Sequence, residues 1–101
     1  MKIIWRSSAV QSLIRLDNWR KDNGWPEIAK HLVEVIESYF QHLDFDVYVP
    51  GRVVTIKNLP VNMRLTLISL GKSEPYKVFY RLGRDEIDIF LIRHPRQKSL
   101  K

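Results

Sequence analysis

The stretch PYKVFYRLGRDEIDIFLIRHPRQ, residues 75–97, contains the best-formed hairpin pattern of the chain. Two runs within it, residues 76–82 and 86–93, are rich in aromatic and β-branched side chains, which favour strands. The link between them, residues 83–85, combines a glycine with charged residues, as hairpin turns often do. The stretch therefore predicts an antiparallel β-hairpin.

Side chains alternate along the first run of this hairpin, as they do in a strand that buries one face. One face receives apolar residues: Val78, Tyr80 and Leu82. The other face receives two cations on either side of a phenylalanine: Lys77, Phe79 and Arg81. We therefore expect the sheet to pack one face on helices and to leave the other face half-polar.

The residues before the hairpin predict a strand and two helices. KIIWR, residues 2–6, reads as a short strand. A helical spacing of apolar residues then extends from near Ser8 to Asn23 and Gly24, which suit a helix C-cap. A second helical pattern begins at Pro26, which is tolerated in a first helical turn. Because the link is short, the helices are expected to form an antiparallel hairpin.

After Asp44 the apolar period changes from helical spacing towards alternation. This change predicts strands near residues 52–56 and 64–70, separated by turns. The expected fold class is therefore α+β: an N-terminal strand, an antiparallel α-hairpin, then a three- to four-stranded antiparallel β-sheet. The length of 101 residues predicts a single domain spanning residues 1–101.

The composition is that of a folded soluble protein, with 45% hydrophobic and 28% charged residues. The absence of cysteine excludes disulfides, thiolate metal sites and thiol nucleophiles. No apolar run approaches the roughly 20 residues that a membrane-spanning helix needs, and the first residues do not resemble a secretion signal. We therefore expect a cytoplasmic protein without membrane contact.

Positive charge is concentrated in the second half of the chain. Residues 1–50 carry 6 Lys and Arg against 7 Asp and Glu, whereas residues 51–101 carry 11 against 4. Such a field attracts nucleic acid or acidic protein segments, and the attraction weakens with salt. The sequence does not by itself choose between these partners.

The histidines and acidic residues do not predict a metal site. His31 and His42 are 11 residues apart, and Asp44 and Asp46 fall in an expected loop. This spacing matches no common ligand pattern. We therefore expect neither a metal nor another cofactor.

The three tryptophans have different expected roles. Trp5 belongs to the first predicted strand and is expected in the core. Trp25 is expected to pack at the start of the second helix. For Trp19, beside Arg15 and Arg20, core packing is favoured, and an exposed anchor for another protein is the alternative.

This order of elements resembles the RelE/ParE superfamily of type II toxins. Three stretches carry the resemblance: IIWRSSAVQSLIRLDNWRKDNGWPEIAKHLVEVI (3–36), PYKVFYRL (75–82) and EIDIFLIRHPRQ (86–97). The last is similar to ParE-type endings, in which an aliphatic strand leads into a histidine and basic residues. The resemblance implies a bacterial or phage toxin neutralised by a cognate antitoxin with a flexible, acidic C-terminal segment, which suits the basic half of this chain.

The superfamily contains two activities. ParE-like members bind DNA gyrase and trap its cleaved DNA complex, whereas RelE-like members cut messenger RNA in the ribosomal A site. RNA cleavage requires a general base, a general acid and cations that stabilise the transition state. The candidate residues for such a reaction are Arg64, Lys77, Arg81, Arg93, His94 and Arg96.

The resemblance to the RelE-like branch is incomplete. Lys77 stands where those nucleases place an arginine, so the charge is kept with a different geometry. They also tend to carry closely spaced lysines on the preceding strand, where this chain has Arg64, Thr66 and Ile68. No tyrosine follows Tyr80. A ParE-like gyrase inhibitor is therefore favoured, with RelE-like mRNA cleavage as the alternative.

Binding of the antitoxin or of the target is assigned to the last two strands and the residues after them. The candidate contacts are Lys77, Phe79, Arg81, Arg93, His94 and Arg96. For Arg93 and Arg96, a grip on carboxylates or phosphates and a solvated sheet edge are equally supported readings.

His94 has two interpretations. As a general acid or base, it would be pushed towards its neutral form by the neighbouring arginines. As a residue at a strand end, which we favour, it would be hydrogen-bonded to backbone. A third function, a general RNA-binding module, is disfavoured because the expected sheet lacks a basic and aromatic RNA-recognition signature.

Overall fold

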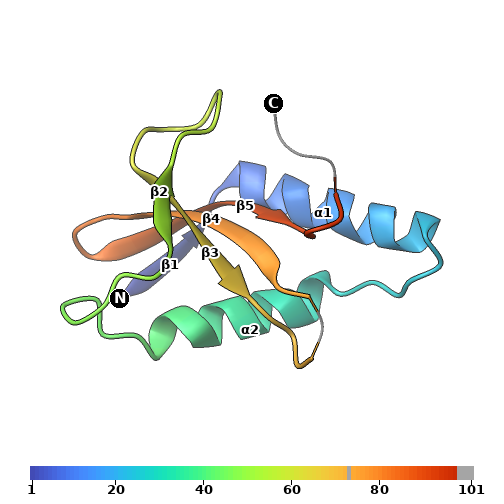
Figure 1. Cartoon of the computed structure of the whole chain (residues 1–101), viewed down its shortest axis with the longest axis horizontal. Coiled ribbons are helices and arrows are strands. Elements are labelled where there is room, and N and C mark those ends of the chain that lie inside the picture. The colour runs from blue at the N-terminus through green and yellow to red at the C-terminus, as the bar shows by residue number, and fades with distance from the viewer. Residues whose placement is uncertain (73, 98–101) are drawn as a thin grey trace.

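The computed structural model describes residues 1–72 and 74–97 and has the expected α+β class (Figure 1). Two helices and five strands follow one another along the chain: β1 (Lys2–Trp5), α1 (Ser7–Asp22), α2 (Ala29–Gln41), β2 (Arg52–Val54), β3 (Met63–Ile68), β4 (Tyr76–Leu82) and β5 (Glu86–Arg93). No helix in these residues is long and apolar enough to cross a membrane.

The strands form one mixed sheet in the order β1-β5-β4-β3-β2. Strands β2 to β5 are antiparallel neighbours, as expected, but β1 pairs parallel to β5, from Lys2 opposite Glu86 to Trp5 opposite Ile89. The prediction of a three- to four-stranded antiparallel sheet is therefore wrong in strand number and direction. The physical reason is that the outer edge of β5 needs a hydrogen-bonding partner, and the N-terminal strand provides one.

Helix α1 covers the part of the β5 edge that β1 does not reach. The Ser8 hydroxyl donates to the carbonyl oxygen of Phe90 at 2.7 Å, and the backbone N–H of Ile92 donates to the Ser12 hydroxyl at 2.9 Å. Ser12 in turn donates to the carbonyl oxygen of Ala9 at 2.7 Å. Because residues four apart lie on one side of a helix, two serine side chains take the place of a neighbouring strand.

The contact with β5 also explains where α1 begins. The helix was expected to begin near Ser8; it begins at Ser7, with Arg6 as N-cap and no side-chain cap. The Ser8 hydroxyl is directed to β5 instead.

Helix α2 begins later than Pro26, because a side chain of α1 caps it. The carboxylate of Asp17 accepts hydrogen bonds from the N–H groups of Ile28 and Ala29, at 2.8 and 3.1 Å. These are two of the N–H groups that have no partner within a helix's first turn. This cap joins the two helices, which run in roughly opposite directions (Figure 1).

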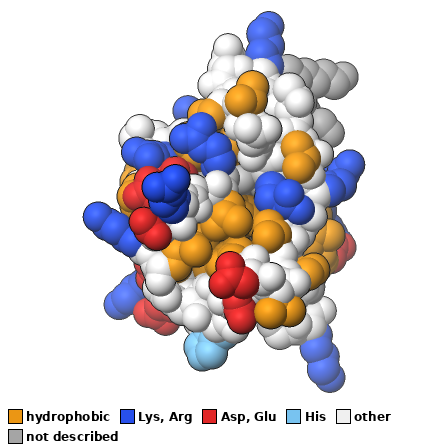
Figure 2. Space-filling model, turned by 90° about the vertical axis from the view of Figure 1, so that its left-hand side faces the viewer, with side chains coloured by type: hydrophobic (Ala, Val, Ile, Leu, Met, Phe, Trp, Pro, Cys, Tyr) orange, Lys and Arg blue, Asp and Glu red, His pale blue; other side chains and the backbone are white. Residues whose placement is uncertain are grey.

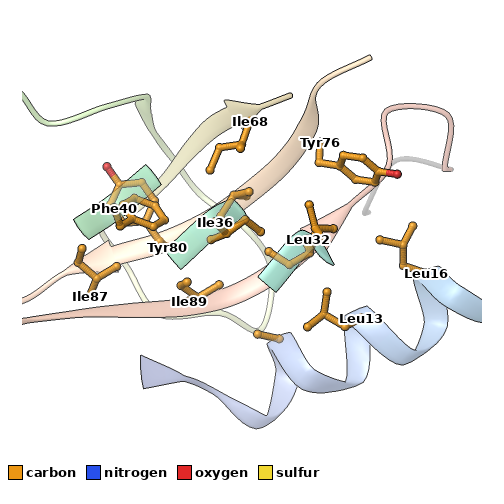
Figure 3. Packing of buried hydrophobic residues seen from close by; sticks show 13 residues of the cluster. Leu13, Leu16, Leu32, Ile36, Phe40, Ile68, Tyr76, Tyr80, Ile87 and Ile89 are labelled. Carbon is orange, nitrogen blue, oxygen red and sulfur yellow. The ribbon is translucent and has the colours of Figure 1, made fainter. Parts of the chain in front are cut away.

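The main core lies between both helices and one face of the sheet (Figure 3). Leu13 and Leu16 of α1, and Leu32 and Ile36 of α2, point towards the strands (Figure 3). The sheet contributes buried residues from three strands: Ile68, Tyr76, Val78, Tyr80, Ile87, Ile89 and Ile92. This is the helix-covered face that the alternation in residues 76–82 predicts, since Val78 and Tyr80 lie in it.

A β-bulge in β5 changes the faces of the residues beyond it. Phe79 lies opposite Leu91 and Tyr80 lies opposite Ile89, so Phe90 is an extra residue without a partner position. Ile89 and Ile92 therefore both join the main core, whereas Phe90 packs on the opposite face of the sheet.

That opposite face, called the open face below, carries a second small core. Its buried members are Met63, Phe79 and Phe90. Partly buried residues of β2, β3, β5 and the segment after β2 pack against them: Val54, Ile56, Leu59, Leu65 and Leu91. The strand expected at residues 52–56 is shorter than predicted, and residues 56 and 59 cover this small core instead.

Replacing Ser12 by alanine should destabilise the fold by about 1–3 kcal/mol, because the buried N–H of Ile92 loses its acceptor. The free energy of unfolding from urea titration tests this expectation. Ser7→Ala is the matched control, since Ser7 is exposed on the same helix and should change stability by less than about 0.5 kcal/mol. Equal values for the two variants would contradict the proposed role of Ser12.

Candidate functional site

Beyond β5 the chain turns and closes a hollow at the end of the sheet. The N–H of His94 donates to the side-chain oxygen of Gln97 at 2.8 Å, and the N–H of Gln97 donates to the carbonyl oxygen of His94 at 3.0 Å. The hollow has a volume of about 370 Å³ and is lined by Arg20, Trp25, Pro26, Glu74, His94 and Arg96. We call it the His94 hollow.

The ring of His94 is enclosed by three aromatic side chains. Ring centroids lie 4.9 Å from Trp19, 5.7 Å from Trp25 and 5.2 Å from Tyr76, and His94 is only 8% exposed. The prediction that Trp19 packs in the core is confirmed, because it packs against the main core as well as this ring. Trp25 meets Trp19 edge to face at 5.4 Å.

The backbone around His94 fixes its tautomer. The N–H of Arg96 donates to Nδ1 of His94 at 3.0 Å, so this nitrogen is an acceptor and the ring proton resides on Nε2. Protonation of Nδ1 would place two donors against each other. The interpretation of His94 as a residue at a strand end that is hydrogen-bonded to backbone is confirmed.

The surroundings of His94 favour its neutral form. Burial lowers the pKa of His94 below its usual 6.5, and the positive charges of Arg20 and Arg96 lower it further, against the opposing effect of Glu74. The expected direction, towards neutral imidazole, is thus correct. The main cause is burial among aromatic rings; the opposing effect of Glu74 comes next, and the effects of Arg20 and Arg96 are smaller.

Arg20 organises the other wall of the hollow. Its Nε donates to the carbonyl oxygen of Pro26 at 2.8 Å, and one terminal nitrogen donates to the Tyr76 hydroxyl at 3.0 Å. Its guanidinium also lies 5.4 Å from the centre of the Trp25 ring. Burial raises the pKa of Tyr76 above its usual 10.0, although Arg20 opposes this shift.

Sequence reasoning did not assign Arg20 to a site. The signal that could have found it is its position in the last turn of a helix, followed closely by a tryptophan and a proline. That arrangement turns the chain back over the arginine.

Arg96 forms the exposed rim of the hollow. It pairs with Glu74 at 3.2 Å, with both side chains more than half exposed. A pair this exposed contributes little to stability, about 0–1 kcal/mol. A carboxylate or phosphate that entered the hollow would have to compete with Glu74 for Arg96.

Four further candidate residues lie on the open face of the sheet, away from the ring of His94. Lys77 is directly opposite Arg93 in the strand register. Phe79 is 5% exposed and belongs to the second small core, so its ring is buried beneath the exposed side chains of this face. Arg81 lies near the buried carboxylate of Asp88 at 3.9 Å, and its guanidinium is 5.7 Å from the Phe90 ring centre.

Asp88 has a closer cation than Arg81. Arg6 pairs with this carboxylate at 2.7 Å. The burial of Asp88 on the open face therefore draws both arginines towards it.

Arg64 lies at a third place, near the start of β2. Its Nε and one terminal nitrogen donate to the carbonyl oxygens of Pro50 and Gly51, at 3.3 and 3.0 Å. The Tyr80 hydroxyl donates to the same Pro50 oxygen at 2.6 Å. Burial raises the pKa of Tyr80 to about 12, against the effect of Arg64. Arg64 thus holds the chain before β2 in place.

The structure therefore distributes the candidate catalytic residues. His94 and Arg96 share the His94 hollow, whereas Lys77 and Arg81 lie on the open face and Arg64 holds the chain before β2. Within residues 1–72 and 74–97, no group of three or more His, Cys, Asp or Glu residues could hold a metal ion.

Comparisons with known proteins return no match: no family model, no curated protein and no solved structure matches this chain.

The pKa of His94 predicts a pH dependence of stability. Because the folded ring binds a proton less readily than the unfolded one, stability is full above the unfolded pKa of 6.5 and falls as the pH drops below it, until the folded ring is also protonated. Urea unfolding at several pH values, from about 7.5 to about 5, measures this loss.

The variant His94→Gln should lack this part of the pH dependence, whereas His42→Gln, at an exposed position, should keep it. Nitrogen chemical shifts of the ring should show the proton on Nε2. A folded-state pKa at or above 6.5 would contradict the enclosure described here.

Proposed function

We propose that this protein is the toxin of a type II toxin–antitoxin pair and acts as a ParE-like inhibitor of DNA gyrase. It binds its target by protein contact in the cytoplasm and is neutralised by a cognate acidic antitoxin. The resemblance of residues 3–36, 75–82 and 86–97 to the RelE/ParE superfamily supports this proposal. So does an α+β fold in which two helices follow a first strand and an antiparallel meander follows the helices.

The state of His94 is the observation that carries the choice of inhibitor over nuclease. A general base needs a nitrogen that can accept a proton from the substrate. Nδ1 of His94 already accepts the N–H of Arg96, and the ring is 8% exposed. The residue best suited to acid–base chemistry is thus engaged within its own chain.

The positions of the cations also favour an inhibitor over a nuclease. Stabilising a phosphorane-like transition state requires several cations that converge on one phosphate. Arg64 is bound to backbone carbonyls, and Arg81 lies against Asp88 and Phe90. These side chains shape the fold, and they are spread over separate parts of the molecule.

Exposed apolar side chains favour protein contact. Val47 is 81% exposed and Tyr48 58% exposed in the loop between α2 and β2. Figure 2 shows one face of the molecule, the left-hand side of Figure 1, with hydrophobic side chains gathered in the middle and Lys and Arg beside and above them. Apolar surface rimmed by charge is typical of protein interaction sites.

A RelE-like ribosome-dependent mRNA endoribonuclease is the second candidate. The observation in its favour is that His94, Arg20 and Arg96 line one hollow. A substrate phosphate that displaced Glu74 from Arg96 would enter a hollow that Arg20 and His94 also line.

Two assays with purified protein separate the candidates. A ParE-like inhibitor should block supercoiling by gyrase and cause linear cleaved DNA to accumulate, with no cleavage of a message on ribosomes. A RelE-like enzyme should give cuts in the ribosomal A site and leave gyrase unaffected.

The variant His94→Gln sharpens the comparison. A nuclease that uses this ring should lose a hundredfold or more in rate, on the order of a general acid or base contribution. An inhibitor that acts by surface contact should keep its potency within about threefold, a change of less than about 1 kcal/mol. His42→Gln is the control, and circular dichroism confirms that both variants are folded. A hundredfold loss of gyrase inhibition in folded His94→Gln would contradict the proposed mode of action.

A further inference from the structure

The second half of β3 has no neighbouring strand on one of its two sides. β3 runs from Met63 to Ile68, but β2 pairs only with residues 63–65. Beyond Leu65, β3 is paired with β4 on one side, and among the described residues no strand pairs with its other side. We call residues 66–68 of β3, together with Ser69 directly after the strand, the β3 edge.

Gly51 explains why β2 begins only at Arg52, opposite Leu65. This residue has a φ of +84°, and a Cβ atom on it would lie only 2.2 Å from the carbonyl oxygen of Leu65. Only glycine fits where the backbones approach so closely. The chain enters β2 across Leu65, and β2 pairs with no later residue of β3. Of these later residues, Leu67 is exposed, whereas the side chains of Thr66 and Ile68 are buried.

Hollows lie on both faces of the sheet along this edge. One, of about 400 Å³, is lined by Gly51, Arg52, Leu65, Thr66, Leu67 and Lys77. We call it the basic hollow. The other, of about 460 Å³, lies between α2 and the β3 edge, and its apolar lining includes Val35, Tyr39 and Ile68. Leu67, which is 55% exposed, belongs to both.

This arrangement suits an added strand. A chain that pairs with the β3 edge places successive side chains on alternate faces of the sheet. One set would enter the basic hollow and the other would enter the hollow beside α2. Four edge residues span about 13 Å, which is enough for several backbone hydrogen bonds.

The lining of the hollows specifies the chemistry of the occupant. Arg52 and Lys77 line the basic hollow, and among residues 1–72 and 74–97 neither takes part in an ion pair. They belong to the half of the chain that holds 11 Lys and Arg against 4 Asp and Glu. Side chains that enter this hollow are therefore acidic, and those that meet Val35 and Tyr39 are apolar.

We propose that the β3 edge binds an extended segment of a partner protein in which acidic and apolar residues alternate. The segment pairs with residues 66–69, directs its carboxylates to Arg52 and Lys77, and packs its apolar side chains between α2 and β3. The identification of this segment as part of the antitoxin rests on the proposed function. A second copy of this chain is a poorer occupant, because antiparallel pairing of two such edges brings their cations together.

The probe is a synthetic peptide of alternating Glu and Val, eight residues long, with blocked termini; its counterpart has Lys in place of Glu. In a two-dimensional NMR titration of the protein, the Glu peptide should shift amide signals of Gly51, Arg52 and residues 66–69. The edge amides should also exchange more slowly with solvent. The Lys peptide should bind at least about tenfold more weakly than the Glu peptide, and added salt should weaken the binding of the Glu peptide.

Charge reversals test the contacts. Lys77→Glu and Arg52→Glu should each raise the dissociation constant of the Glu peptide about tenfold, equivalent to about 1.4 kcal/mol of binding free energy. Arg84→Glu, an exposed cation in the β4–β5 turn, is the matched control and should stay within about twofold. Equal losses in all three variants, signals that move elsewhere, or no binding at millimolar peptide would overturn the assignment. So would dimers in sedimentation that protect the same edge amides without peptide.

Gyrase inhibition by Lys77→Glu and by the parent chain separates this inference from the proposed function. Inhibition of gyrase without peptide binding removes only the β3 edge assignment. Peptide binding at the edge without gyrase inhibition removes the proposed target and retains the edge as the binding site of an acidic segment.

Discussion

Both backbone edges of β5 need hydrogen-bonding partners, and this requirement positions β1 and α1. This strand is largely buried, so its backbone groups on both sides must have partners. β4 pairs with one side, and on the other side β1 pairs with the first residues and Ser8 and Ser12 of α1 with later ones. Helix α1, which is 16 residues long, is thereby fixed against the last strand. The helices are in turn held where their apolar sides cover the sheet.

The bulge at Phe90 decides what each end of β5 presents. Before it, Ile87 and Ile89 point towards the helices; after it, Ile92 does. With strict alternation, His94 would lie on the open face. The extra residue instead turns His94 towards Trp19 and Tyr76, on the side of the helices. One inserted residue therefore places His94 on the helix side of the sheet and Arg93, opposite Lys77, on the open face.

The local sequence pattern was sufficient to predict the hairpin of β4 and β5, but not the elements that pack beside it. The runs 76–82 and 86–93 coincide with β4 and β5, because alternation and β-branched composition are properties of the residues themselves. The parallel pairing of β1 and the start of α2 at Ala29 depend on groups far along the chain. Period-two alternation does not state which edge a strand will join, nor that an aspartate in one helix caps the next.

The same limit applies to the candidate sites. The sequence predicted a shift of His94 towards its neutral form through adjacent arginines and, as a separate interpretation, a strand-end residue hydrogen-bonded to backbone. It did not show that burial would be the main cause of the shift. It did not predict the ring of tryptophans or the role of Arg20, because these come from the turn that joins the helices. Nor did it predict the β3 edge. That surface exists because β2 is shorter than the strand beside it, which follows from the close contact of Gly51 with Leu65.

The two basic surfaces differ in what an anionic ligand would gain from them. In the His94 hollow, Arg20 is bound by Pro26 and Tyr76 and Arg96 by Glu74, so a ligand must replace existing partners. Its net gain is the difference between two similar interactions. At the β3 edge, the proposed acidic segment would meet Arg52 and Lys77, which have no carboxylate partner within residues 1–72 and 74–97, together with backbone that no strand pairs and apolar surface. A larger gain is therefore expected at the β3 edge than in the His94 hollow, which is the physical argument for the proposed binding of an acidic segment at that edge.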